Sequence, residues 1–312
     1  MFQRLIKNDL KENKVSMLVI GLFLLLTLTL SFAATRLTVS LTSSIERFVE
    51  TAKSPHLLEM HSGSVDRERL QNFVQQHPEI ASWQLTDFVN VEGSAIRINE
   101  KNSLQDSSQD NGFSSQNQNF DFLLDQNNQP AQPQPGQVYI PLYYYNNGKI
   151  KIGDKIRVGK LQLTVQGFIR DAQMNAGLVS SKRFLISPTD LQTLKKEAVA
   201  SNENLIAFRV HKLSQISAIE QAYKNAELES NGPPMITYPT IKMINGFNDA
   251  LVILVMGLLV VAIIGITFLC MRFALLTKIQ EELQQIAIMK VMGLPQSFIS
   301  RVYLTKYYFC LA

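Results

Sequence analysis

Two long uncharged runs stand out in the pattern of apolar and polar positions along the chain. They cover residues 15–35 and residues 250–271. An α-helix rises about 1.5 Å per residue, so about 20 apolar residues cross the roughly 30 Å hydrocarbon core of a bilayer. The second run, 22 residues long, lacks the polar face that a buried helix of a soluble protein normally shows. Both runs therefore predict transmembrane helices.

The first run also has the features of a signal peptide, because Ser31-Phe32-Ala33 suits a cleavage site. The apolar region of a signal peptide usually spans about 7–15 residues. The first run is longer, which favours an uncleaved anchor. Basic residues precede this run, and others follow the second one. The positive-inside rule then predicts that residues 1–14 and 272–297 are cytoplasmic and that residues 36–245 lie outside.

The region between the runs mixes helical and extended patterns, which predicts an α+β domain. Apolar residues recur at helical spacing in two stretches, and Ser187-Pro188 followed by Asp190 marks a third helix start. The two stretches are residues 66–76 and 214–226. Runs of β-forming residues predict strands at 83–91, 138–145, 149–158, 161–169 and 205–210. Pro141 suggests that the second of these strands lies at a sheet edge, and Gly159 suggests a hairpin between the third and the fourth.

Residues 102–137 differ from their surroundings in composition. Fifteen of these 36 residues are Asn or Gln, and none is Lys or Arg. Such a segment buries too little apolar surface to offset the entropy of ordering it. We expect most of it to be a mobile insertion, in which Phe120 to Leu124 dock as a short strand.

Composition and motifs point away from an enzyme or a nucleic-acid binder. The net charge of +4 is mild, and the mean hydropathy of +0.02 confines the membrane part to a few spans. The four histidines show no metal-ligand spacing, and Asp121, Asp125 and Asn127 do not fit a calcium loop. No nucleophile elbow or phosphate-binding loop is present. We expect no catalytic, cofactor or metal site, and energy from ATP would need another subunit.

An amphipathic helix is predicted after the second run. Its apolar positions are Leu276, Ile279, Leu283 and Ile286, with acidic residues on the other face. A helix lying on lipid is one interpretation, but anionic lipid would repel the acids, which favours a protein partner. The helix is expected to stop at Gly293. Residues 298–312 then become apolar and aromatic, as at the start of a third span.

Residues 285–293, Gln-Ile-Ala-Ile-Met-Lys-Val-Met-Gly, resemble the E-I-G-I-L-K-A-L-G signature of MacB/FtsX-like ABC-transporter permeases. The region outside resembles the periplasmic-core-like domain of that family at residues 138–141, 151–156 and 165–171. One departure is Gln285, where the family often has Glu. The resemblance covers nearly the whole chain. It implies four spans, so a sequence that reaches only the start of the third is expected to be a fragment or a truncated product.

The resemblance also implies the partners and the location. They are a second permease copy, two ATP-binding subunits docked on the cytoplasmic helices, and the cell membrane, which the chain crosses more than once. By the same resemblance, the residues expected to couple to the ATPase are Gln285, Ile286, Ile288, Met289, Lys290 and Gly293.

Within that family the size of the outer region favours the transport branch over the regulators of cell-wall hydrolases. A two-span receptor is the competing class. It would need a signalling region after residue 271, whereas the chain there returns toward the membrane.

Overall fold

The structure is a computed structural model that describes residues 14–177, 179–281, 283–293, 295–298 and 300–301. The chain divides into two compact units, which we treat separately: residues 42–248, called the large domain below, and residues 1–41 together with 249–312. The cytoplasmic N-terminus expected at 1–14 and the third span expected at 298–312 lie almost entirely outside the described residues.

Two long helices and one short helix make up most of the described part of the smaller unit. They are α2 (Lys14–Thr51), α7 (Tyr238–Glu281) and α8 (Leu283–Val291), and the last turns of α2 and the first turns of α7 belong to the large domain. By length and composition, Gly21–Thr51 and Tyr238–Phe273 are candidate membrane spans. With 44 residues, α7 is about 66 Å long, twice the thickness of a hydrocarbon core.

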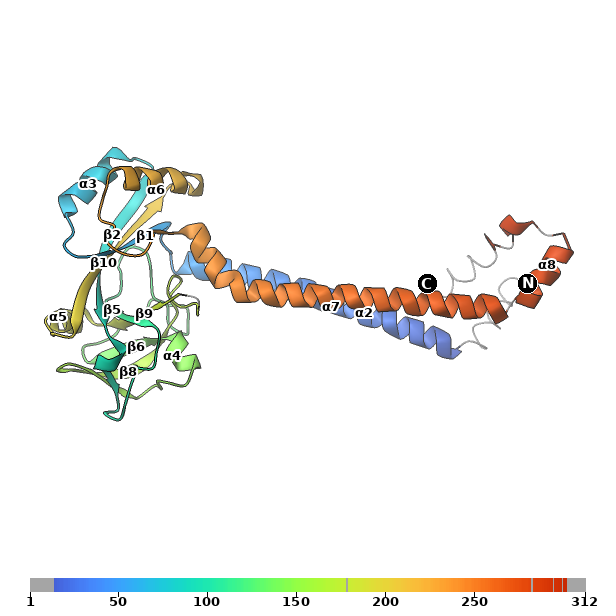
Figure 1. The fold of residues 1–312 in the computed structure, drawn as a ribbon, viewed down its shortest axis with the longest axis horizontal. Coiled ribbons are helices and arrows are strands. Elements are labelled where there is room, and N and C mark those ends of the chain that lie inside the picture. Colours follow the sequence, from blue (N-terminus) through green and yellow to red (C-terminus); the bar gives the residue numbers. More distant parts are fainter. Residues whose placement is uncertain (1–13, 178, 282, 294, 299, 302–312) are drawn as a thin grey trace. The chain divides into compact units, whose positions relative to one another are not determined.

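The large domain confirms the α+β class (Figure 1). Its strands are β1 (Leu57–Ser62), β2 (Ile80–Val91), β3 (Ile96–Ile98), β4 (Asn102–Ser103), β5 (Asp110–Ser114), β6 (Gln137–Pro141), β7 (Lys155–Val158), β8 (Leu161–Ile169), β9 (Ser181–Ile186), β10 (Ala200–Val210) and β11 (Ile236–Thr237). Its own helices are α3 (Arg67–Gln76), α4 (Leu142–Asn146), α5 (Pro188–Leu194) and α6 (Ile216–Asn225), with 3₁₀ turns at Gly93–Ala95 and Leu213–Gln215.

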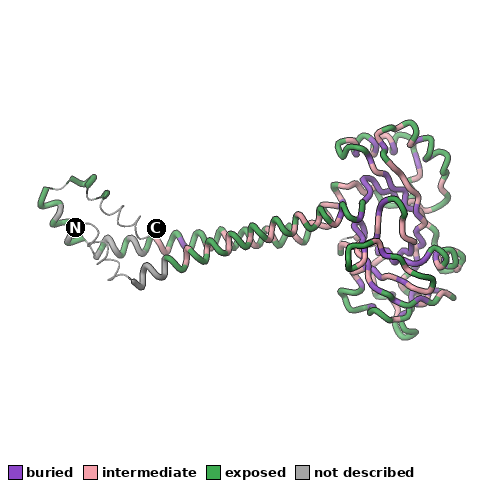
Figure 2. Tube along the Cα trace, turned by 180° about the vertical axis from the view of Figure 1, so that it is seen from behind, coloured by how far each residue is buried: buried purple, intermediate pink, exposed green. Residues whose placement is uncertain are grey.

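Among the described residues all of these strands join one mixed sheet in the order β11-β1-β10-β2-β5-β9-β6-β8-β7-β3-β4. The pairs β5–β9 and β6–β8 are parallel, and the other pairs are antiparallel. Helices α3 and α6 cover β1, β2 and β10 (Figure 1). One core lies beneath them, around Phe73, Phe208 and Tyr223, and a second lies around Val138, Ile156 and Phe184. Figure 2 shows that the buried stretches of the trace, in purple, gather in the large domain.

Local signals in the sequence placed several elements correctly. Asp66 caps α3 by accepting hydrogen bonds from two backbone N–H groups, and Ser187 caps α5 in the same way with one. Strands β7 and β8 form the expected antiparallel hairpin, with Gly159 at a φ of +56° in the turn. Strands β2 and β10 are longer than predicted, because their ends are fixed by pairing with each other rather than by local composition.

The expectation of a strand over residues 138–145 is wrong for its second half. Strand β6 ends at Pro141, and the next five residues form α4. The expected edge position is also wrong, because β6 lies between β8 and β9. A proline is tolerated there because it is the last residue of the strand, where a missing N–H interrupts no ladder.

The expectation of a mobile insertion over residues 102–137 also needs correction. Strand β5 lies in the middle of the sheet, between β2 and β9, and Phe113 is completely buried against Phe184 at 4.8 Å between ring centres. The amides that suggested disorder replace missing apolar contacts with hydrogen bonds: Gln116 pairs with both backbone groups of Leu123, at 3.0 and 3.1 Å. Phe120 and Leu124 are buried as expected, although this stretch forms isolated bridges rather than a strand.

Candidate functional site

The segment expected to couple to an ATPase lies on α8. This helix contains the expected coupling positions 285, 286, 288, 289 and 290. Positions three or four residues apart in a helix, such as 285 and 288 or 286 and 290, lie on neighbouring turns of one face. Ile288 and Lys290 are exposed, as are Val291 and Met292. The side chains of Gln285, Ile286 and Met289 lie outside the described residues. The segment therefore presents apolar side chains that no other part of the described chain covers.

Gly293 ends this helix in the way the sequence predicted. Its φ is +80°, and its N–H donates to the carbonyl of Lys290 at 3.0 Å. A glycine adopts this left-handed conformation without the steric cost that a Cβ brings, and it commonly terminates helices. Glu282, between α7 and α8, is not described, so the expected continuity of the two helices stays a prediction.

A cluster of buried charges, which sequence analysis missed, lies in the large domain. Arg183 on β9 is almost fully buried between two carboxylates, and its guanidinium donates to Asp171 at 2.7 Å and to Asp121 at 2.9 Å. Gln173 also donates to Asp121, and Asn117 donates to it at 3.0 Å. We call these five residues the Arg183 cluster. Two carboxylates around one planar guanidinium satisfy most of its donors, which is what allows the charges to be buried.

The charges of the Arg183 cluster are held by one another. Burial alone would lower the pKa of Arg183, but Asp121 and Asp171 hold it above its usual value. Burial works to raise the pKa of both carboxyl groups, and Arg183 opposes it. The balance leaves the pKa of Asp121 raised and that of Asp171 lowered, because Asp171 also accepts backbone hydrogen bonds from Gln173 and Met174. Asp121, which the sequence analysis tested as part of a calcium loop, thus forms an ion pair with Arg183.

The Arg183 cluster lies beside both helix ends that enter the large domain. The N–H of Asp121 donates to the carbonyl of Lys53, and the N–H of Phe122 donates to that of Ala52, at 2.9 and 2.7 Å, directly after the end of α2. In the first turns of α7, Asn245 donates to the carbonyl of Ala172 at 2.5 Å. The loops that carry the cluster are therefore tied to both helices by hydrogen bonds.

Only weak signals for this cluster exist in the sequence. Lys182-Arg183 directly precedes the apolar run Phe184-Leu185-Ile186, and a charge at the start of such a run signals either an exposed edge or a buried partner. The sequence analysis included Asp171 only as the last residue of the stretch 165–171, which resembles the periplasmic-core-like domain. The pairing of residues 121, 171 and 183 depends on the sheet order, which no local pattern reveals.

Among the described residues, no group of three or more His, Cys, Asp and Glu side chains is arranged to hold a metal ion. His56 is instead used in structure: its Nδ1 accepts from the N–H of Val210 at 3.0 Å. Burial and the charge of Arg209 lower the pKa of His56 to about 4. The ring is therefore neutral near neutral pH.

Comparison with known proteins gives structural neighbours only. No family model and no curated protein matches the sequence. The chain is similar to the periplasmic region of MacB from Actinobacillus actinomycetemcomitans, with 10% identity and a TM-score of 0.32, over 64% of this chain and 96% of that one. It is also similar to the extracellular domain of the noncanonic ABC-type transporter YknZ from Gram-positive bacteria, with 13% identity and a TM-score of 0.30, over 58% of this chain and 98% of that one. MacB, named by the resemblance of the sequence, is thus among these neighbours.

Proposed function

We propose that this chain is the permease subunit of an ABC transporter, and that a separate ATP-binding subunit drives movement of its large domain to extrude a substrate. The observation that carries the proposal is the order of elements. A candidate span, an α+β domain of about 200 residues, a second candidate span and the 285–293 segment follow one another. A domain placed between two spans on one side, with a partner-binding helix on the other, is an arrangement suited to passing movement across a membrane.

The helices supply a rigid path for that movement. Helix α7 runs without interruption from Tyr238, in the large domain, to Glu281. At the large domain, the Asn245 hydrogen bond and an ion pair of 3.0 Å between Lys242 and Glu46 fix its first turns. A displacement at the cytoplasmic end would therefore be carried to the loops that hold the Arg183 cluster, without a flexible joint inside the large domain.

On the cytoplasmic side we assign the contact with the ATP-binding subunit to Gln285, Ile286, Ile288, Met289, Lys290 and Gly293. The apolar members would pack into a groove of the partner, Lys290 would pair with an acidic residue, and Gly293 would let the chain turn back toward the membrane. A second permease copy and a third span beginning within residues 298–312 complete the proposed assembly.

A pair of double variants tests this assignment. Ile286→Asp with Met289→Asp places two charges at a buried interface, where an unpaired charge costs several kcal/mol, about 3 to 5. Gln284→Asp with Ala287→Asp has the same spacing and charge, but lies about 200° away around α8, where both residues are exposed. We expect the first variant to lose co-purification with the ATP-binding subunit, and the control to keep it. Equal co-purification of the two variants would contradict the assignment and favour a helix that lies on lipid.

The topology is tested separately. Gln126 is exposed in the large domain, and a cysteine there should react with an impermeant thiol reagent on intact cells in which the native cysteines are replaced. A cysteine at Gln284 should react only after lysis. The reverse pattern would exclude the proposed orientation and the transporter assignment with it.

A further inference from the structure

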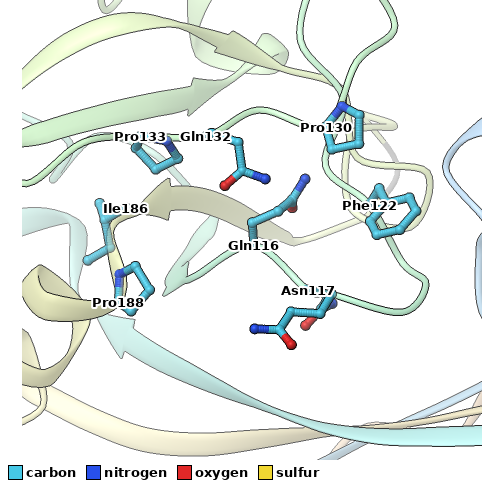
Figure 3. Close-up of a pocket in the computed structure, with 9 residues that line it drawn as sticks. Gln116, Asn117, Phe122, Pro130, Gln132, Pro133, Ile186 and Pro188 are labelled. Carbon is cyan, nitrogen blue, oxygen red and sulfur yellow. The ribbon is translucent and has the colours of Figure 1, made fainter.

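We propose that the cavity at the carboxyl ends of β5 and β9 binds an uncharged carbohydrate. The cavity has a volume of about 430 Å³ and is formed by three stretches: residues 116–118 after β5, residues 130–133 before β6, and residues 186–188 at the end of β9 (Figure 3). Phe122 completes its wall. The volume lies within the range of about 300 to 1,000 Å³ that is typical of small-molecule sites.

The sheet topology creates this cavity. Strands β5 and β9 are parallel neighbours, so both end on the same side of the sheet. Beyond Ser114 the chain enters the long segment that leads to β6, whereas beyond Ile186 it turns into α5. In open α/β sheets, the crevice outside the carboxyl ends of parallel strands, where the connections part, is a recurrent place for ligands. Strands β5 and β9 form one such parallel pair within this mixed sheet.

The lining has hydrogen-bonding capacity without charge. None of its nine residues is ionisable, and four carry carboxamides. Two of these amides are already fixed: Gln116 by the backbone of Leu123, and Asn117 by Thr86 Oγ1 at 2.7 Å and by Asp121. Each carboxamide oxygen still has a lone pair available, and Gln116 keeps one N–H. A ligand would therefore meet amides that have already lost their rotamer freedom.

The other two amides, Gln118 and Gln132, are exposed, and we find no hydrogen bond from either side chain to the described protein. In Figure 3 the amide groups of Gln116 and Gln132 point toward one another across the cavity. Around them, Phe122, Ile186 and the rings of three prolines supply apolar surface. The cavity therefore offers donors, acceptors and apolar faces side by side.

This combination fits a sugar better than an ion or a peptide. A pyranose ring has an apolar C–H face and a rim of hydroxyl groups that both donate and accept, which matches carboxamides next to ring faces. An ionised ligand would find no opposite charge to offset its loss of hydration. A peptide could not bind here by adding a strand to the sheet, because β5 and β9 are each paired on both sides and leave no free strand edge.

The test measures binding to the whole chain in lipid nanodiscs by titration calorimetry. The probes are maltotetraose and the tetramer of N-acetylglucosamine, both uncharged, with trigalacturonate and an uncharged proline- and serine-rich decapeptide for comparison. We expect at least one neutral sugar to bind, and trigalacturonate and the decapeptide to bind at least tenfold more weakly. The measurement requires no ATP-binding subunit, so its outcome is independent of the transport function.

Two double variants localise the binding. Gln118→Ala with Gln132→Ala removes the two exposed amides for which we find no hydrogen bond to the described protein, so we expect the fold to be retained and the affinity to fall about tenfold or more. Gln126→Ala with Gln129→Ala makes the same change at two exposed positions of the same segment that are not among the lining residues, and should leave the affinity unchanged. The inference is overturned if neither sugar binds at concentrations up to about 10 mM. It is also overturned if the two variants behave alike, or if trigalacturonate or the decapeptide binds as well as the sugars do.

Discussion

The large domain and the two long helices place opposite kinds of side chain on their surfaces. The large domain buries a charged residue, Arg183, which is only 1% exposed. Helix α7 instead exposes apolar residues such as Phe268, which is 68% exposed. In water, exposed apolar area costs about 25 cal/mol per Å², and a buried charge is tolerated only when it is paired. The comparison teaches that the two regions fold for different surroundings: water around the large domain and hydrocarbon around the helices.

The largest effect is expected from breaking the buried pairing. Arg183→Met leaves Asp121 and Asp171 buried without a cation, and removal of one partner from a buried pair costs about 3 to 5 kcal/mol. We expect the large domain to unfold at much lower urea concentration. The fluorescence of Trp83, the single tryptophan of the chain, reports this transition in the whole protein in detergent.

The matched control for this change is Arg157→Met. Arg157 pairs with Glu100 on the surface, where the two side chains are 42% and 58% exposed. Such pairs contribute about 0 to 1 kcal/mol. If the two variants unfold at the same urea concentration, the Arg183 cluster does not stabilise the large domain.

A smaller loss of stability is expected when Gly112 on β5 is replaced, and its presence or absence tells a packed segment from a mobile one. A Cβ built on this residue would lie 1.7 Å from the ring of Phe88, which is itself fully buried. Overpacking of this kind costs about 1 to 3 kcal/mol, so Gly112→Ala should lower the urea midpoint. In a segment that is mobile in the folded protein the same change would leave the midpoint nearly unchanged, because alanine would restrict the folded and the unfolded chain alike. Gly177→Ala, with no atom within 4 Å, is the control and should not be destabilising.

The contrast at Gly112 also shows where sequence reasoning ends. Caps, hairpin turns and apolar runs are local, so α3, α5, the β7–β8 hairpin and the two candidate spans could be predicted from their own residues. Strand β5 could not, because Asp110–Ser114 has little apolar character of its own and is ordered by β2 and β9, which lie far away in the sequence. The proposed coupling segment was located from a resemblance, and the structure adds its helical backbone and its glycine stop.

The carbohydrate cavity illustrates the same limit. Its amides belong to the composition that suggested disorder, but contacts such as the bidentate pairing of Gln116 with the backbone of Leu123 fix part of the segment. Composition measures how much apolar surface a segment can bury, but it does not measure how many polar groups find partners. Residues 102–137 were misjudged for that reason.

A pH-dependent effect of similar or smaller size is expected at Glu59 on β1. The residue is 3% exposed, and burial raises its pKa to about 7, although Lys224 opposes the shift. The folded protein therefore binds this proton more tightly than the unfolded chain does. The stabilisation is complete below pH 4.5, the ordinary value for the group, and is lost as the pH rises through about 7.

Glu59→Gln removes this titration. At pH 8 the variant should be more stable than the original protein by roughly 1 to 2 kcal/mol, and near pH 4.5 the two should be alike. Glu203→Gln makes the same change in charge on β10 and is the control. Urea midpoints measured from pH 4.5 to pH 8 decide the matter: a difference that does not grow with pH would mean that Glu59 is not buried as a neutral acid.

The smallest effect is expected between the long helices, where a polar contact lies in apolar surroundings. The hydroxyl oxygens of Thr27 and Thr267 are 2.9 Å apart, but each hydroxyl also has a carbonyl acceptor one turn earlier in its own helix, at Phe23 and Ile263. A hydroxyl has one hydrogen, so a bond across the helices replaces a bond within one of them and adds little. Interhelical hydrogen bonds in membranes average about 0.6 kcal/mol.

A double-mutant cycle with Thr27→Val and Thr267→Val, followed by unfolding in SDS, should give a coupling of about that size. Thr35, whose hydroxyl donates to the carbonyl of Ser31 in its own helix, is the control, and the cycle of Thr35→Val with Thr267→Val should give no coupling. A Thr27–Thr267 coupling well above about 1.7 kcal/mol would show that the helix pair depends on this bond, and would weaken the contrast between a charge-paired domain and helices held by lipid and apolar packing.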